Sequence, residues 1–207
     1  MSIENKRPQI KETVGAQYVC FAQSNPEGVY ESVYEEKVEK TEVVKSVSVT
    51  ENATSTKVRA SGKDYDVVSI LASTDISVEV VAFPAETLAK MRGDVIEDNG
   101  LIISGGNKER PYFAYGKVVV LKNGHYRFEW YPKCKLTANT DDVTTSDVEF
   151  AEQNDTFTIS AMAFNDNGDN RTKVETEFKL PEGLTEDKFF SKPILTPEDL
   201  MSVLAGE

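Results

Sequence analysis

The residues that could carry out chemistry are few and stand apart from one another. The chain has one histidine, His125, and two cysteines, Cys20 and Cys134. A zinc site needs several nitrogen or sulfur ligands, and no second histidine or cysteine stands beside His125, so we expect no metal there. Each cysteine lies in a strand-like run, which predicts two buried free thiols rather than a disulfide framework.

The densest group of oxygen ligands is the run Asn165-Asp-Asn-Gly-Asp-Asn170. An EF-hand loop that began at Asn165 would need glycine where this chain has Asn170, and glutamate where it has Thr176. A hairpin turn is therefore the better interpretation. Two acid pairs could still bind a cation weakly, namely Asp141 with Asp142 and Asp166 with Asp169.

Nothing in the sequence assembles into a catalytic site. No serine elbow accompanies the lone histidine, and neither a phosphate-binding loop nor a dinucleotide fingerprint is present. Paired carboxylates for glycoside hydrolysis would need an aromatic-lined cleft, whereas the aromatic residues here look like core. We therefore expect no enzyme, no catalytic residue, no cofactor and no metal.

Charge is unevenly distributed along the chain. The net charge is −12, and residues 141–207 contribute 16 acids against 5 bases, so the first two thirds are nearly neutral. A protein that grips phosphate would instead cluster lysine and arginine. We expect this chain to repel nucleic acid or let it slide past, although an acidic face that aids solubility is the more common explanation of such a bias.

The bulk composition is that of a folded domain. The 207 residues are 39% hydrophobic and 28% charged, which suits one large domain or one domain with extensions. No apolar run approaches the length of a membrane-spanning helix, and the first residues lack the apolar region of a signal peptide. We expect a protein that is made in the cytosol.

The strongest structural signal is a hairpin near the middle of the chain. Residues 111–122 and 125–137 are rich in β-branched and aromatic residues and are joined by Asn123-Gly124, a pair typical of a tight turn with positive φ. In the second strand Tyr126, Phe128 and Trp130 alternate with other residues, which predicts one aromatic face turned inward.

Other strands flank this hairpin. We expect strands at residues 14–23, 28–36, 101–104, 148–150, 157–164 and 172–180, with a loop over residues 138–147. Residues 65–83 form a long β-rich run in which Ser73-Thr74 predicts a bend or bulge. Residues 36–61 are polar and rich in Val, Thr and Ser, and they predict either a hairpin or a long loop that orders against a partner.

Two short helices complete the prediction. Residues 84–93 start with proline and end with Gly93, and residues 196–204 start with the threonine cap Thr196. The whole pattern predicts a mainly β fold, a β-sandwich or partly open barrel with one short flanking helix, a long polar loop or hairpin, and a C-terminal helix. We divide the chain into an N-terminal arm (1–12), a β domain (13–182) and a C-terminal extension with a short helix (183–207).

The order of these segments resembles the major tail proteins, the tail tube subunits, of bacteriophages with long non-contractile tails. The resemblance covers roughly residues 13–180. It rests on residues 14–22, on 46–50 leading into 57–66, on 74–80 followed by the small helix and Gly93, on the Asn-Gly hairpin with residues 126–131, and on 155–161.

The resemblance implies a tail-tube-type β-sandwich whose protomers join edge to edge in a hexameric ring, with rings stacked through long loops. It implies as partners the chain itself and other tail proteins (tape measure, terminator and baseplate), DNA only in transit, and a place in the virion. Interface residues would then be Val47, Val49, Lys57 and Arg59, and deletion of residues 47–59 should leave a folded monomer that cannot polymerise. Candidate acids of the lumen are Glu149, Glu152, Asp155, Glu175 and Glu177.

Two other functions stay open. A tail terminator or a baseplate tube component of similar fold would cap a tube rather than extend it. A β-sandwich module that binds carbohydrate or another ligand would show a cluster of exposed aromatic residues and act as a monomer.

Overall fold

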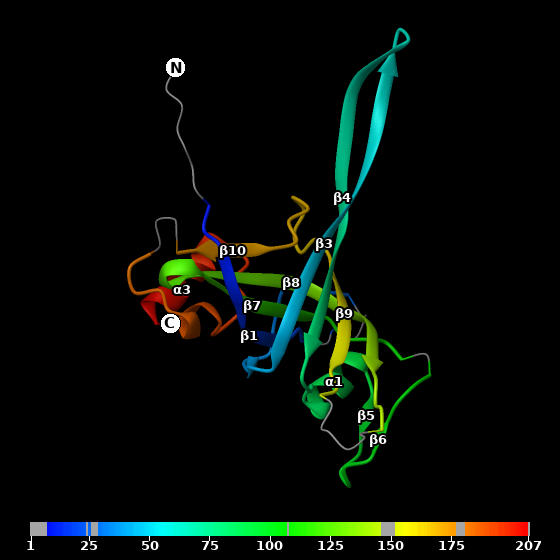
Figure 1. Ribbon diagram of the computed structural model, residues 1–207, viewed down its shortest axis with the longest axis vertical. Helices are drawn as coiled ribbons and strands as arrows, with labels where there is room; N and C mark the ends of the chain where they lie inside the picture. Colours follow the sequence, from blue (N-terminus) through cyan, green and yellow to red (C-terminus); the bar gives the residue numbers. More distant parts are fainter. Residues whose placement is uncertain are drawn as a thin grey trace.

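The computed structural model describes residues 8–23, 25, 29–106, 108–145, 152–176 and 181–206, and it confirms a mainly β fold with short helices (Figure 1). None of the helices in these ranges is long and apolar enough to cross a membrane. The strands are β1 (Lys11–Phe21), β2 (Glu39–Thr41), β3 (Val44–Ala60), β4 (Lys63–Val80), β5 (Val95–Ile96), β6 (Ile102–Ile103), β7 (Phe113–Leu121), β8 (His125–Asp141), β9 (Asp155–Ala161) and β10 (Thr172–Glu175). The helices are α1 (Ala85–Arg92), α2 (Glu186–Phe189) and α3 (Pro197–Ala205).

One antiparallel sheet holds most of the strands, and it curls on itself. Its order is β2-β1-β7-β8-β9-β4-β3, with β10 paired to β8. The two ends of this order, β2 and β3, are joined in the chain by only Glu42 and Val43. Because so short a link cannot cross a flat sheet, the two edges must come together. β1 and β3 do approach each other, but no ladder joins them in the described residues, so the fold is a partly open barrel.

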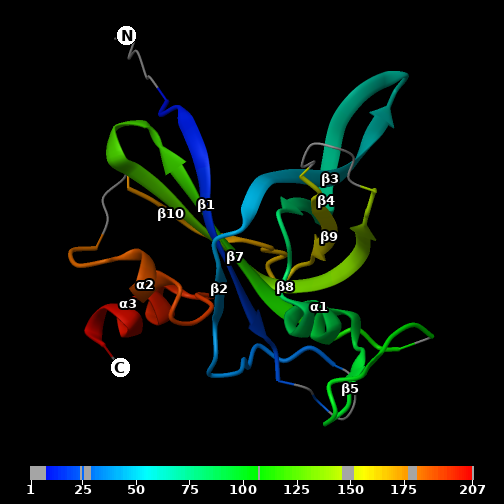
Figure 2. The ribbon, with the colours of Figure 1, turned by 60° about the horizontal axis from the view of Figure 1, so that its bottom comes forward.

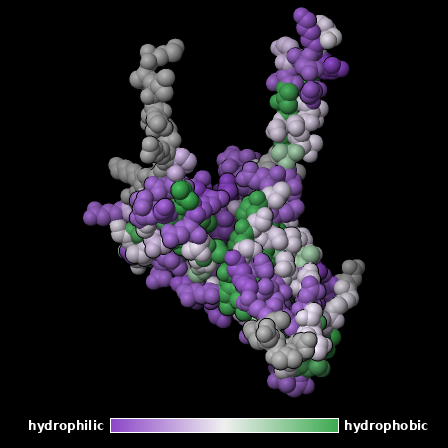
Figure 3. All heavy atoms as spheres, viewed as in Figure 1, coloured by the Kyte–Doolittle hydropathy of each residue, from purple (hydrophilic) through white to green (hydrophobic). Residues whose placement is uncertain are grey.

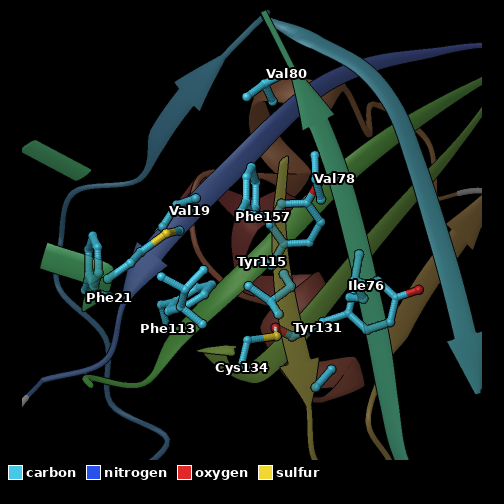
Figure 4. Packing of buried hydrophobic residues seen from close by; sticks show 14 residues of the cluster. Val19, Phe21, Ile76, Val78, Val80, Phe113, Tyr115, Tyr131, Cys134 and Phe157 are labelled. Carbon is cyan, nitrogen blue, oxygen red and sulfur yellow. Dashed lines mark hydrogen bonds between the residues drawn. The ribbon is translucent and has the colours of Figure 1, made fainter. Parts of the chain in front are cut away.

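The inside of the curl is the main hydrophobic core. Every second residue of a strand faces the same side, and the inward positions of β1, β4, β7, β8 and β9 are apolar and buried. Figure 4 shows these side chains meeting from separate strands. They include Val19, Phe21, Ile76, Val78, Val80, Phe113, Tyr115, Tyr131, Phe157 and Ile159.

The outside of the same sheet carries a second core, which the C-terminal residues cover (Figure 2). Tyr18, Phe128 and Trp130 on the sheet pack against Phe189 and Phe190 of the C-terminal segment. The rings of Tyr18 and Phe190 stack with their centroids 3.9 Å apart, and the indole Nε1 of Trp130 donates a hydrogen bond of 3.1 Å to the carbonyl of Phe189. The predicted aromatic face is buried at Phe128 and Trp130, but Tyr126 is 39% exposed, and the sequence does not predict that Tyr131 is buried on the opposite face of the sheet.

Several short-range predictions are confirmed. Asn123 and Gly124 both have positive φ, although the loop between the paired residues Leu121 and His125 contains three residues rather than two. Helix α1 ends at Gly93, which takes the left-handed conformation. The register of β3 and β4 shifts between Asn52/Ser73 and Ala53/Leu71, which is the bulge expected near Ser73.

Other strand predictions are wrong. The described residues between 29 and 36 contain no strand but one isolated bridge, Ala22 with Tyr34. β8 continues to Asp141, through residues expected to be loop. Residues 165–170 turn, but not as a hairpin, because β9 and β10 both pair with β8, one after the other along its length. The strand expected at 148–150 lies outside the described residues.

Candidate interaction surfaces

The β3–β4 hairpin projects far beyond the rest of the sheet (Figure 1). Its ladder runs from Val44 with Val80 to Ala60 with Lys63, whereas the neighbouring β4–β9 ladder ends at Thr74 with Ala161. Among the residues that the structure describes, 53–71 therefore pair only with each other. Eight residue pairs extend the hairpin by about 26 Å at ~3.3 Å per residue.

The projecting part exposes apolar side chains of considerable size. Tyr65 is 79% exposed and Ile70 is 66% exposed. The pairing of Val58 with Asp66, Thr56 with Val68 and Thr54 with Ile70 places Val58, Val68 and Ile70 on one face of the ribbon. Figure 3 shows hydrophobic residues among the polar ones on the hairpin. We call the exposed set the tip patch: Val58, Tyr65, Val67, Val68 and Ile70.

The structure separates the four residues that were predicted to form an interface. Val47 and Val49 lie in the part of β3 that belongs to the body, and they pack against the main core. Lys57 and Arg59 lie on the projecting part, where both approach Asp64, at 3.4 Å and 2.8 Å. The interface role of all four stays a prediction.

A second exposed apolar group lies at the opposite end of the molecule. β5 and β6 form a small two-stranded hairpin after α1, in which Val95 pairs with Ile103 and Ile96 with Ile102. In Figures 1 and 2 this hairpin and the tip of β3–β4 occupy opposite ends. We call its exposed side chains the lobe patch: Val95, Ile96, Leu101, Ile102 and Ile103.

Charged residues gather inside one end of the curled sheet. Lys117 and Glu129 are both nearly fully buried, and the Lys117 Nζ lies 2.8 Å from the Glu129 carboxylate. The Nε of Arg127 lies 2.5 Å from Oε1 of Glu175, and within the described residues this contact is an ion pair that does not meet hydrogen-bond geometry. Arg171 approaches Glu51 at 3.3 Å. Apart from Glu175, these side chains line an open cavity of about 370 Å³ together with Lys11, Val47, Val49 and Tyr131.

The cations of this cluster favour the ionised form of Glu129. Burial disfavours the charged carboxylate of Glu129, but the nearby cations of Lys117, Arg171 and Arg127 outweigh that effect and keep its pKa below the usual value. Burial raises the pKa of the Tyr131 hydroxyl, and the carboxylate of Glu129 raises it further. The cluster is thus a buried ion network, in which the Tyr131 hydroxyl also donates a hydrogen bond of 3.2 Å to the Glu129 carboxylate.

The acids predicted to line a lumen have different environments. Glu175 is buried and its charge is matched by Arg127 and by Lys173 at 3.3 Å. Glu152 is exposed and pairs with Lys45 at 2.6 Å. Asp155 starts β9 and is partly exposed. Glu149 and Glu177 lie outside the described residues.

The other chemistry-bearing residues have structural surroundings. Cys20 and Cys134 are free and fully buried, and burial raises the pKa of the Cys20 thiol to about 12, helped by Glu35. The Nδ1 of His125 lies 3.1 Å from the hydroxyl of Thr176. In the acidic turn, Asn165 and Asp169 bond to each other, side chain to side chain at 2.8 Å.

Comparisons with known proteins identify no family. No family model matches the chain, and no curated protein matches it. Among solved structures, a chain in the cryo-EM structure of the anti-feeding prophage baseplate is similar over 84% of this chain and 97% of its own, with a TM-score of 0.39 and 8% sequence identity. This likeness is too low to assign a family or a function.

Sequence reasoning missed the lobe patch and the buried ion network. The apolar run of residues 101–104 predicts an ordinary strand, and only the structure shows that its hairpin pairs with no other strand in the described residues. The partnership of Lys117 and Glu129 depends on the three-residue loop, since a two-residue loop would have placed Trp130 opposite Lys117.

Proposed function

We propose that this chain is a structural virion protein that self-assembles into hexameric rings, and that the rings stack into a phage tail tube through which DNA is ejected. The observation that carries the proposal is the projecting part of the β3–β4 hairpin, which exposes the tip patch and pairs with no other strand in the described part of the chain.

Such a hairpin needs a partner. A two-stranded ribbon on its own is marginally stable in water, and ordering its residues requires compensating burial. Five large apolar side chains remain exposed on it, more than scattered surface residues require. A protein surface that covers the ribbon would supply the missing burial.

The outer edge of β3 supports the same proposal. β3 has 17 residues and pairs only with β4 in the described part of the chain, so its other edge offers unpaired backbone groups. Exposed edges of this length promote pairing with another chain. Closing the curl with copies of the same chain would remove the edge without exposing a new one.

The charge distribution suits passage of DNA without capture. Acids dominate the last third of the chain, and exposed carboxylates repel phosphates, the reverse of the counterion release that drives binding. Glu152 and Asp155 are the described candidates that keep some exposure. The proposed partners are further copies, together with tape measure, terminator and baseplate proteins. The proposed location is the virion after synthesis in the host cytoplasm.

One observation favours a different function. Tyr30 and Tyr112 meet edge to face beside a pocket of about 190 Å³, and Lys133 and Lys135 lie over these rings. Aromatic rings beside polar groups are typical of ligand sites. A monomeric module that binds carbohydrate is therefore the second candidate.

Electron microscopy of the purified protein, with its mass measured over a range of concentrations, distinguishes these functions. Sixfold rings or tubes are expected. Rings that never elongate would favour a terminator or a baseplate tube component. A monomer at every concentration would overturn the proposal, and glycan affinity measured on that monomer would support the binding module.

A further inference from the structure

The tip patch and the lobe patch are different surfaces at opposite ends of one molecule. The tip patch lies on a long ribbon, with Val58, Val68 and Ile70 on one face and Val67 on the other, whereas the lobe patch belongs to a short hairpin held next to α1. All five apolar residues of the lobe patch are at least 38% exposed. Neither surface is covered by a described part of its own chain.

The β5–β6 hairpin, which we call the lobe, holds its apolar side chains toward solvent. Its turn is closed by two backbone bonds of 2.9 Å, from the Gly100 N–H to the Glu97 carbonyl and from the Glu97 N–H to the Leu101 carbonyl. β5 and β6 pair only with each other in the described residues. Five exposed apolar residues on such a small hairpin form a contiguous apolar patch. A patch of this kind marks an interaction site.

The two surfaces carry opposite charge. Residues 57–66 at the tip include the bases Lys57, Arg59 and Lys63 and the acids Asp64 and Asp66. Residues 94–106 of the lobe include three acids and no base, although the nearby Lys108 ammonium bonds to the Ile103 carbonyl. Two of these acids, Glu97 and Asp98, have no ion pair within the described residues. Opposite potentials favour the meeting of these surfaces and disfavour the meeting of two tips or two lobes.

We propose that the tip patch of one copy docks on the lobe patch of the next copy. This inference rests on the proposed self-assembly and names the two surfaces that meet. Because the surfaces differ, the contact is head to tail, and it repeats from copy to copy instead of closing a twofold dimer. Their positions at opposite ends of the long axis let successive copies stack without inversion (Figure 1).

Charge reversal with compensation tests the pairing. Lys57→Glu with Lys63→Glu reverses the tip and keeps the ion pair of Arg59 with Asp64, while Glu97→Lys with Asp98→Lys reverses the lobe. Each reversed protein should need roughly tenfold or more protein for half-maximal assembly. The protein that carries both reversals should assemble at nearly the wild-type concentration. The matched control is Asp141→Lys with Asp142→Lys, an exposed acid pair outside both patches, which should assemble normally.

A cysteine pair tests the same contact without changing charge. Both native cysteines are fully buried, so thiols introduced at Val67 and Ile102 would be the accessible ones. Under mild oxidation the Val67→Cys/Ile102→Cys protein should form a ladder of linked chains on a non-reducing gel. The control Val67→Cys/Met201→Cys, with the second thiol on exposed α3, should form no ladder.

The outcomes separate this inference from the proposed function. A wild-type protein that forms rings or tubes, with reversals that have no effect or no rescue and with no ladder, would overturn the tip-to-lobe contact alone. A wild-type protein that stays monomeric would overturn the self-assembly itself. If a reversed protein failed to fold, the cysteine pair would decide the question.

Discussion

Gly116 on β7 leaves the space that the ring of Phe190 fills. A Cβ atom at position 116 would lie 2.8 Å from Phe190 Cε1 and 3.0 Å from Trp130 Cε3. Since real side chains do not approach so closely, the sheet and the C-terminal segment are fitted to each other at this point. Position 116 carries glycine because a side chain would find no space there. The backbone φ at this position does not require glycine.

Gly116→Ala should destabilise the fold by about 1–3 kcal/mol, the usual effect of overpacking a filled core. Adding Phe190→Leu to Gly116→Ala should recover part of that loss, because the smaller side chain returns space to the methyl group. Denaturant unfolding of the wild type, both single variants and the double variant measures the coupling. Strictly additive losses would show that position 116 and the ring of Phe190 do not compete for space.

Removal of residues 183–207 tests how far the C-terminal segment is part of the fold. The deletion would expose Tyr18, Phe128 and Trp130 on the outer face of the sheet. Truncating one buried phenylalanine typically costs about 3–5 kcal/mol, and this segment buries two, Phe189 and Phe190. We expect an insoluble or dye-binding product in place of a stable β domain. A soluble product with a sharp unfolding transition would support a separable extension.

Removing one partner of the buried pair of Lys117 and Glu129 should destabilise the fold more than replacing both partners with apolar residues. Glu129→Gln leaves the Lys117 ammonium buried without its counter-charge, which typically costs about 3–5 kcal/mol. Lys117→Met with Glu129→Leu should be less destabilising than Glu129→Gln alone. Urea unfolding of the three variants checks this order, and equal losses would contradict it.

The same pair predicts how stability depends on pH. Since the pKa of Glu129 is lower in the folded chain than its usual value of 4.5, its contribution is fully present above that value. The contribution is lost as the pH falls through the folded-state pKa. The free energy of unfolding should therefore decline less between pH 5 and pH 3 in the Lys117→Met/Glu129→Leu protein than in the wild type. Parallel curves would indicate that Glu129 titrates normally.

The sequence predicts local structure well where neighbouring residues determine it. Proline and glycine bracket α1, Thr196 caps α3 through a bond from the Asp199 N–H, and Asn123-Gly124 adopts positive φ. Each of these features depends on a few adjacent side chains.

Features that depend on distant contacts could not be predicted in the same way. Trp130 is buried because α2 and the residues after it cover the outer face of the sheet, whereas Tyr131 lies in the main core, and no local pattern encodes the outer cover. Position 47 could be assigned to a strand, but only the register of β3 with β4 shows that Val47 packs in the body while Lys57 stands on the projection. The prediction of a hairpin between β9 and β10 is wrong for the same reason, since a turn motif does not reveal which strand its neighbours pair with.

The structure changes which deletion best isolates the proposed assembly function. Deleting residues 47–59 would remove Val47 and Val49 from the core and leave much of β4 unpaired, so this deletion should unfold the chain.

Ala53 and Leu71 lie opposite each other in the ladder, so an Asn-Gly turn can replace residues 54–70 with little strain. The shortened protein should keep its stability within about 1 kcal/mol, because loop shortening is tolerated where no core contact is lost. It should also form no rings or tubes at concentrations where the wild type does. Light scattering and microscopy of both proteins, each first checked by thermal unfolding, test the prediction, and normal assembly of the shortened protein would show that the projecting ribbon is not an assembly element.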